Sequence, residues 1–255
     1  MRRVVIAALV LLGMVGWAGA DVAERGVAEL LAEIVEEFSG DPAADGPFGV
    51  VGIRVVDEGS WHAVRGGDGW VLREGPPDGP ALGYVVDEAT LRTIIRGEMS
   101  ALTAGGRASM SDPAPFDLEM LGGFAPSPEQ AAELLPFTFH FWTVGSPEVV
   151  PFGREHSRVV HGANASVLYY QPGLRTAWYG IERDQHVNRD PEDQTNPFPS
   201  LCVFIAGRTT ARIGGETVQL ERGEAVLIPA GTAHEFWNEQ AELAEMIIIM
   251  FGEGA

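Results

Sequence analysis

The sequence is poor in cysteine and in basic side chains. It contains a single cysteine, Cys202, and 17 Lys and Arg residues against 36 Asp and Glu residues. One cysteine excludes an intramolecular disulfide, so an oxidising compartment, although permitted, is not used for stapling. The net charge of −19 repels a polyphosphate backbone or an anionic lipid surface at long range, so we expect no nucleic-acid partner. With 255 residues, 45% of them hydrophobic, two domains with real cores are expected.

The N-terminus has the layout of a secretory signal peptide. Two arginines precede an apolar run from Val4, and residues 18–20 are small (Ala-Gly-Ala). We assign residues 1–20 to a signal peptide, so that the mature chain starts near Asp21, is secreted or periplasmic and has no stable membrane insertion. Losing the two arginines takes the net charge from −19 to −21. The alternative is an uncleaved anchor, because the 17 residues from Val4 to Ala20 are at the lower limit for crossing a bilayer as a helix.

Residues 21–121 mix helix and strand patterns. Apolar residues recur at helical spacing from Val27 to Phe38, which predicts an amphipathic helix. Four short strands follow, read as a meander, in residues 48–56, 60–65, 70–75 and 81–86. Asp87 then caps a helix that Gly97 stops, and another helical turn or two follows. The stretch "GGRASM" is expected to return to strand, and "FDLEML" to close the unit as a helix.

Two stretches of this half, "GSWHAVRGGDGWVLREG" and "DEATLRTIIRGEMSALTAGGRASMSD", resemble the sterol carrier protein type 2 family of lipid-binding domains. The resemblance implies an α/β (α+β) sandwich with an apolar tunnel between a five-stranded sheet and the helices, able to hold a fatty acyl chain or a sterol. The candidate lipid-cavity residues are Leu31, Ile34, Ile94, Ile95, Met99 and Leu102. An apolar helical stripe is also ordinary core, and no cluster of acid, base and nucleophile marks this half as catalytic.

Residues 122–147 form a hinge segment in this reading. A short helix is expected over residues 129–135, after the Pro-Ser-Pro turn. The aromatic run Phe137, Phe139, Phe141 and Trp142 is too apolar for a free linker, so we expect it to pack between the domains or across a subunit interface.

Residues 148–255 read as nine short strands separated by glycine and proline turns, which predicts a β-sandwich or barrel. The stretch "GEAVLIPAGTAHEFWN" (residues 223–238) matches the second sequence motif of the cupin superfamily and resembles it at every position: Gly223, Pro229, Gly231, His234 and Asn238. The resemblance implies an all-β jelly-roll barrel with His234 pointing inward. Gly231 can take a positive φ, and the strand period puts His234, Phe236 and Asn238 on one face.

The companion cupin motif is incomplete. Its glutamate position holds Ser200, and the nearest thing to its histidine pair is His186 with Asn188. Three readings stay open. His186 and His234 share a divalent metal, Fe or Mn, with Asn188 or a carboxylate of Asp190, Glu192 or Asp193 as third ligand. Alternatively the barrel is metal-free and binds an organic ligand, in an interior formed by His234, Phe236, Asn238, Trp178 and Tyr169. In the third reading His234 is a structural histidine and the barrel only dimerises.

The favoured interpretation is an exported, non-catalytic protein that carries or senses a hydrophobic or amphipathic small molecule, with no certain cofactor. The alternative is a metal-dependent cupin enzyme, an oxygenase or isomerase of a small organic acid. A homodimer is expected by analogy with cupins, which often pair.

Overall fold

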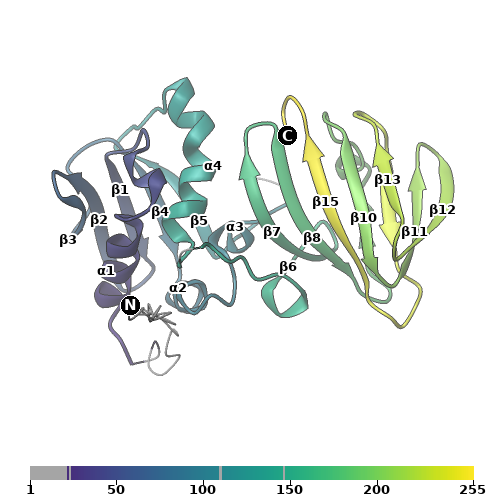
Figure 1. Ribbon diagram of the computed structural model, residues 1–255, viewed down its shortest axis with the longest axis horizontal. Coiled ribbons are helices and arrows are strands. Elements are labelled where there is room, and N and C mark those ends of the chain that lie inside the picture. Colours follow the sequence, from purple (N-terminus) through teal and green to yellow (C-terminus); the bar gives the residue numbers. More distant parts are fainter. Residues whose placement is uncertain (1–21, 23, 109–110, 146) are drawn as a thin grey trace, which may run out of the picture.

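The structure is a computed structural model that describes Val22 and residues 24–108, 111–145 and 147–255. The assigned signal peptide, residues 1–20, lies outside the described residues. Figure 1 shows two units side by side, one of mixed helices and strands and one built of strands. No helix within the described ranges is long and apolar enough to cross a membrane.

The first unit contains one five-stranded sheet in the order β3-β2-β1-β4-β5. The prediction of a four-strand meander is wrong, because β4 pairs in parallel with β1 and not with β3. The burial pattern agrees with the order: nearly every residue of β4 is buried, as in a central strand, whereas half of the residues of β3 are exposed and only one is buried, as at an edge. The strands are β1 (Val50–Val55), β2 (Gly59–Gly66), β3 (Gly69–Glu74), β4 (Ala81–Val86) and β5 (Phe116–Leu121).

The segment "FDLEML" is the strand β5 and not a closing helix, and it pairs antiparallel with β4. Its apolar residues Phe116, Leu118 and Met120 alternate with acidic ones, which is a strand period that outweighs the single apolar turn of a short helix. The described part of "GGRASM", residues 105–108, is not a strand.

The helices α1 (Val27–Phe38), α2 (Glu88–Ile95) and α3 (Ala101–Ala104) agree with the helical spacing in the sequence. The apolar face of α1 is fully buried. Burial of each large side chain stabilises the folded state by about 2 kcal/mol. Asp87 caps α2 by accepting a hydrogen bond from the Thr90 amide at 2.8 Å. The short η1 (Pro42–Asp45) follows α1 and is capped by Asp41.

The hinge segment folds mainly as a long helix. α4 (Pro128–Trp142) continues through Pro136, so the expectation that the helix stops at Leu135 is wrong. A proline inside a helix costs about 3 kcal/mol, but the turns beyond it bury Phe137, Phe141 and Trp142 in the core of the first unit, which offsets that cost. The aromatic run is therefore buried as expected, and most of it belongs to the first unit.

The second unit consists of two facing sheets, in the orders β13-β10-β15-β8-β7-β6 and β12-β11-β14-β9. Their core includes Phe204 from the first of these sheets and Phe236 from the second. All nine predicted strands occur, and the two-residue β9 was not foreseen. They are β6 (Arg158–Val160), β7 (Ala163–Gln171), β8 (Leu174–Ile181), β9 (His186–Val187), β10 (Ser200–Ala206), β11 (Arg208–Ile213), β12 (Glu216–Glu221), β13 (Ala225–Ile228), β14 (His234–Trp237) and β15 (Ala244–Phe251).

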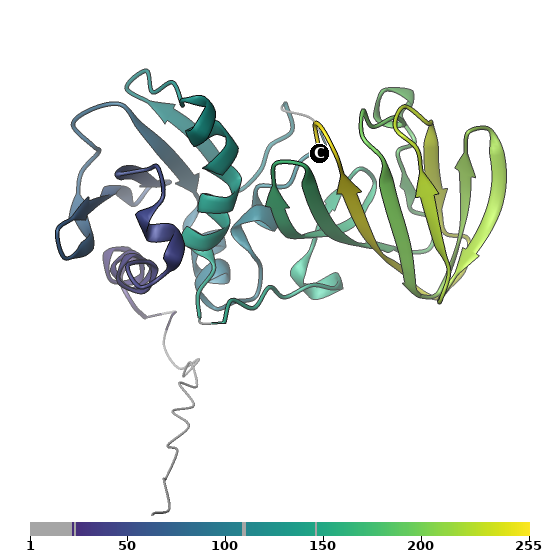
Figure 2. The same ribbon diagram turned by 45° about the horizontal axis from the view of Figure 1, so that its top comes forward.

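The two units meet where α3 and α4 contact β7, a contact that Figures 1 and 2 both show. The hydroxyl of the buried Thr103 accepts a hydrogen bond from the Val167 amide at 2.8 Å. Phe139 makes an edge-on contact with Tyr169, with ring centroids 5.2 Å apart. Direct contacts therefore tie the last helices of the first unit to the first long strand of the second.

Candidate functional site

His234 begins β14 at the end of the turn that the sequence motif predicts. β13 ends at Ile228, directly before Pro229. Gly231 has a φ of 72°, a backbone conformation that glycine adopts without the steric cost that a side chain would add. His234 and Phe236 are buried on the inner side of their sheet, where Phe236 belongs to the core. The predicted inward direction of both side chains is confirmed.

The hydrogen bonding of His234 defines which of its nitrogens carries the proton. Its Nδ1 lies 3.0 Å from the Thr232 carbonyl oxygen, which can only accept, so Nδ1 is the donor. Burial lowers the pKa of His234, opposed by the Thr232 hydrogen bond and aided by the nearby His161. A neutral imidazole with Nδ1 protonated leaves the Nε2 lone pair for a ligand.

Among the described polar atoms of the second unit that are buried without a hydrogen-bond partner, besides the Nε of Arg175, are the Nδ1 of His161 and the hydroxyl of Ser200. Ser200 lies on β10 in the alternation of Cys202 and Phe204, so it faces the same core. Buried polar groups in native proteins are nearly always satisfied, so these two atoms need a partner such as water or a ligand.

The sequence motifs did not identify His161 as a companion of His234. His161 adopts a left-handed backbone conformation, with φ 54°, just before Gly162, and its carbonyl accepts a hydrogen bond from the Asn188 amide at 3.2 Å. The His-Gly turn signal was present in the sequence, but the pairing with the segment of residue 188 is a long-range contact.

His186 does not join His234. In the β9–β14 ladder it stands opposite Trp237, so it shares the face of Trp237 and Glu235, away from His234. Its Nε2 lies 2.6 Å from a carboxylate oxygen of the buried Glu235, which also pairs with Arg212. The predicted metal pair of His186 and His234 is therefore wrong, because side chains on opposite faces of one sheet cannot bind one ion.

The remaining candidate metal ligands do not complete a set around His234. The side-chain amide nitrogen of Asn188 is 3.5 Å from the backbone carbonyl oxygen of His234. The Asp190 side chain caps the short η3 (Pro191–Asp193). Asp193 lies 3.9 Å from the Nδ1 of His161. Over the part of the chain that the structure describes, no group of three His, Cys, Asp or Glu ligand atoms gathers at His234. The residues present do not fit the divalent metal that the family implies.

Asn238 performs a structural task. Its side-chain nitrogen donates to the carbonyls of Ile181 and Glu242 at 2.8 and 2.7 Å, and its oxygen accepts from the Gln240 amide at 2.7 Å. These three contacts use the hydrogen-bonding capacity that a ligand would need. Asn238 therefore fixes the loop that follows β14.

Trp178 and Tyr169 do not line the interior. Trp178 alternates with the core residues Ala177 and Tyr179, and its indole nitrogen donates to Glu245 at 2.9 Å. Tyr169 stands opposite Thr176, on the same outer face as Trp178. It lines a cleft of about 540 Å³ at the junction of the two units, together with Pro136, Phe137 and His140. The predicted interior thus keeps only His234 and Phe236 as facing side chains.

The predicted lipid-cavity residues are buried or half-buried. Leu31, Ile34, Ile94 and Ile95 belong to the first core, Met99 packs against it, and Leu102 is buried. Aromatic rings occupy the same core, among them Phe38, Tyr84, Phe137, Phe141 and Trp142, which contact one another. The space between sheet and helices is accordingly rich in packed side chains.

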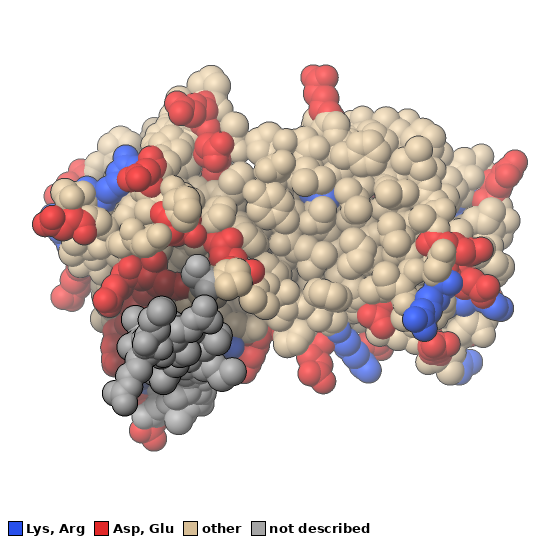
Figure 3. All heavy atoms as spheres, in the orientation of Figure 1, with Lys and Arg blue, Asp and Glu red and all other residues tan. Residues whose placement is uncertain are grey.

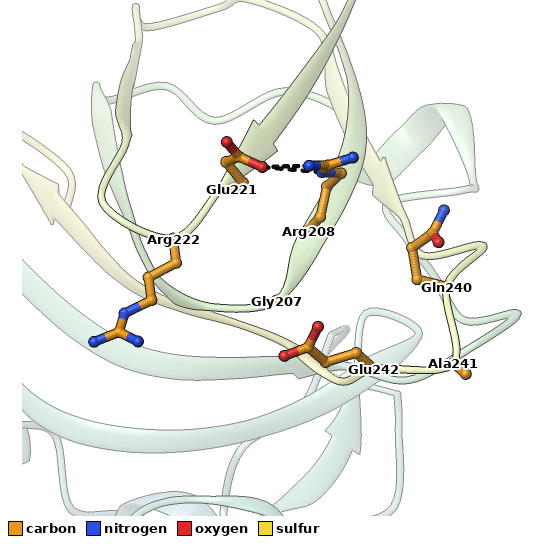
Figure 4. A pocket seen from close by; sticks show the side chains of 7 residues that line it. All are labelled: Gly207, Arg208, Glu221, Arg222, Gln240, Ala241 and Glu242. Atoms are coloured by element: carbon orange, nitrogen blue, oxygen red, sulfur yellow. Dashed lines mark hydrogen bonds and ion pairs between the residues drawn. The ribbon is translucent and has the colours of Figure 1, made fainter.

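A second cleft, of about 440 Å³, lies at one end of the second unit, and Figure 4 shows the residues that line it. Arg208 and Glu221 form an ion pair at 2.6 Å across its rim, whereas Arg222 points away from them. Both partners of the pair are more than half exposed, and none of the predicted site residues lines this cleft. It reads as a solvated surface hollow.

Comparison with known protein families identifies one domain. Residues 190–250 match the family model described as Cupin domain, so the C-terminal part carries a cupin domain with an all-β fold. An uncharacterized protein of Streptomyces coelicolor is 33% identical over 58 residues, which are 22% of this chain and 55% of that protein. The chain thus spans about half the length of this curated relative.

Solved structures that match include a Cupin 2 conserved barrel domain protein from Salinispora arenicola, with 17% identity, a TM-score of 0.36, and coverage of 41% of this chain and 88% of that chain. The plu4264 protein from Photorhabdus luminescens matches with 17% identity, a TM-score of 0.37, and coverage of 41% and 87%.

Proposed function

We propose that the protein is a non-catalytic binding protein that holds a hydrophobic or amphipathic small molecule in the interior of its cupin domain. The observation that supports the proposal is that two polar atoms of the second unit, the Nδ1 of His161 and the hydroxyl of Ser200, are buried without a hydrogen-bond partner. The neutral His234 adds a third polar group, and it interacts electrostatically with His161. Apolar side chains of the core supply the rest of the lining. A mostly apolar interior with a few polar atoms is the usual chemistry of a small-molecule site.

Native mass spectrometry with laurate as an amphipathic probe tests this proposal. The wild-type chain should form a one-to-one adduct, and Ser200→Ala should weaken it roughly fivefold, since one lost hydrogen bond is worth about 1 kcal/mol. Because the Ser200 hydroxyl has no protein partner, Ser200→Ala should leave the unfolding midpoint unchanged. The control is His62→Ala, in the first unit, which should bind as the wild type does. Equal adducts in wild type and Ser200→Ala, or none in either, would count against the proposal.

The alternative, a metal-dependent oxygenase or isomerase, keeps one supporting observation, the Nε2 lone pair of His234. Elemental analysis of protein purified without added metal decides it. Near-stoichiometric iron or manganese that is lost in His234→Ala would replace the binding proposal by the enzyme.

Lipid carriage by the first unit is a separate proposal, based on the sterol-carrier resemblance. The five-stranded sheet with helices supports it, and the packed aromatic core speaks against a wide tunnel. Phe141→Ala removes one of the filling rings, so palmitate binding that appears only in this variant would show that α4 blocks the tunnel. Palmitate bound by the wild type, and kept in Ser200→Ala, would support carriage by the first unit.

Export and pairing complete the proposal. Mass spectrometry of the secreted or periplasmic protein should give a mature chain that starts near Asp21.

A homodimer is supported by the outer face of the larger sheet of the second unit. Ile205, Leu227 and Phe251 are exposed on this face. Few charged side chains lie over β7, β8, β15 and β10 (Figure 3). Sedimentation of the wild type and of Leu227→Asp tests it: a dimer that the aspartate splits is expected.

A further inference from the structure

Three ligating side chains from separate segments converge where the two units join. They are Asp41, which precedes η1, His140, in the last turn of α4, and Glu148, in the segment that leads to the second unit. Their ligand atoms all lie within 4.8 Å of one another, and each side chain is half-buried. None of the three residues belongs to the cupin interior or to its sequence motifs.

The distances match what one ion would require. The Nδ1 of His140 lies 2.7 Å from a Glu148 oxygen and 3.4 Å from an Asp41 oxygen. Ligand atoms at bonds of about 2.1 Å around a single ion are roughly 3.0–3.4 Å apart when adjacent, so both separations are in or near that range. One imidazole nitrogen and two carboxylate oxygens are a donor set that zinc, manganese and iron accept.

The surroundings favour a positive charge. Burial raises the pKa of Glu148, opposed by His140 and aided by the carboxylate of Asp41. Burial and the carboxylates of Glu133 and Glu148 also raise the pKa of Tyr169 across the cleft. Among the described groups that shift these two pKa values there is no Lys or Arg. The negative end of the α4 dipole adds to this field, because His140 lies in the last turn.

Solvent can reach the cluster. His140 lines the cleft of about 540 Å³ at the junction, next to Pro42, Phe137 and Tyr169. Three protein ligands leave coordination positions open, which water from such a cleft can fill.

From this geometry we propose that Asp41, His140 and Glu148 form a binding site for a divalent transition-metal ion, distinct from the cupin interior. The ion connects the α1–η1 loop, the end of α4 and the segment that enters the second unit, so it fastens the junction between the two halves. In the competing arrangement, His140 contacts the two carboxylates directly and no metal is bound.

Calorimetric titration of the full chain, made without a polyhistidine tag, with Zn²⁺ and separately with Mn²⁺ tests the site. One ion per chain should bind, with a Kd below about 100 µM for at least one of the two metals. His140→Gln and Glu148→Gln should each weaken it by more than about 100-fold, the upper end of what losing a mere supporting partner costs. The matched control is His62→Gln, a half-buried histidine of β2 whose Nδ1 faces the Gly75 carbonyl at 2.9 Å; it should bind as the wild type does.

A variant could lose metal binding because it misfolds, so a second experiment uses only the wild-type protein. Crystals of the wild type soaked in Zn²⁺ or Mn²⁺ should show an anomalous peak about 2.0–2.2 Å from the three ligand atoms. No binding by the wild type, or binding that survives in both His140→Gln and Glu148→Gln, overturns the site in favour of the metal-free contact of His140 with the two carboxylates. Binding that is lost only in His234→Ala would also overturn it, and would instead support a metal in the cupin domain.

Discussion

The imidazole of His186 and the carboxylate of Glu235 lie 2.6 Å apart, on the face of the sheet that His234 does not share. Glu235 is buried, and Arg212 is its second partner. One residue along β14 therefore separates two environments: a charged network on the outside and a neutral histidine inside.

Glu235→Gln removes the charge at the centre of the outer network. It should lower the free energy of unfolding by about 1–3 kcal/mol, because Arg212 and His186 lose the charged hydrogen-bond acceptor that the buried Glu235 provides. Urea denaturation measures the change. The control is Glu221→Gln, whose partner Arg208 is 57% exposed and whose loss should cost less than about 1 kcal/mol. Equal costs for both variants would contradict the prediction.

His234 should stay neutral to a lower pH than a free histidine. Its pKa is lowered from 6.5, chiefly by burial, so the unfolded chain binds the proton more readily than the folded one. The contribution of His234 to the free energy of unfolding is then fully present above the pKa of the unfolded chain, and it is lost as the pH drops through 6.5 and below. An NMR titration of the His234 imidazole in EDTA measures this directly. His234→Gln should flatten the pH dependence of the unfolding midpoint relative to wild type, and an unchanged slope would contradict the assignment.

Asn238→Ala should destabilise the protein by about 3 kcal/mol, since it leaves two carbonyls and one amide without their partner in a buried place. Gln240→Ala is the neighbouring control, because the Gln240 side chain is exposed and its backbone amide remains; it should stay within about 0.5 kcal/mol of wild type. Chemical denaturation of both variants is sufficient. A mild effect of Asn238→Ala, combined with loss of laurate binding, would return Asn238 to the ligand site.

Thr103→Val tests the contact between the units. The hydroxyl of Thr103 accepts a hydrogen bond from the Val167 amide at 2.8 Å. Its loss should lower the free energy of unfolding by about 1–3 kcal/mol, so that the two units unfold separately. Thr93→Val makes the same chemical change on α2, where the hydroxyl donates to the Ala89 carbonyl and accepts a long 3.5 Å hydrogen bond from Arg96, so that both of these hydrogen bonds stay within the first unit. Differential scanning calorimetry should show a broadened or split transition for Thr103→Val alone. A single sharp transition in both variants would mean that this hydrogen bond does not couple the units.

Local patterns in the sequence determined much of this protein. Helical spacing placed α1, the Gly-Pro-Gly-His spacing placed the turn before β14, and the strand period placed His234 and Phe236 inside. These features depend on neighbours along the chain, because backbone conformation and side-chain direction repeat over a few residues.

Only the tertiary structure decided which segments meet. It put β4 beside β1, put His186 on the outer face through a two-residue strand, carried α4 past Pro136, and brought Asp41 and Glu148 to His140. Each of these outcomes depends on burial shared between segments far apart in the chain, and the free energy of that burial outweighs local preference without leaving a local signature in the sequence.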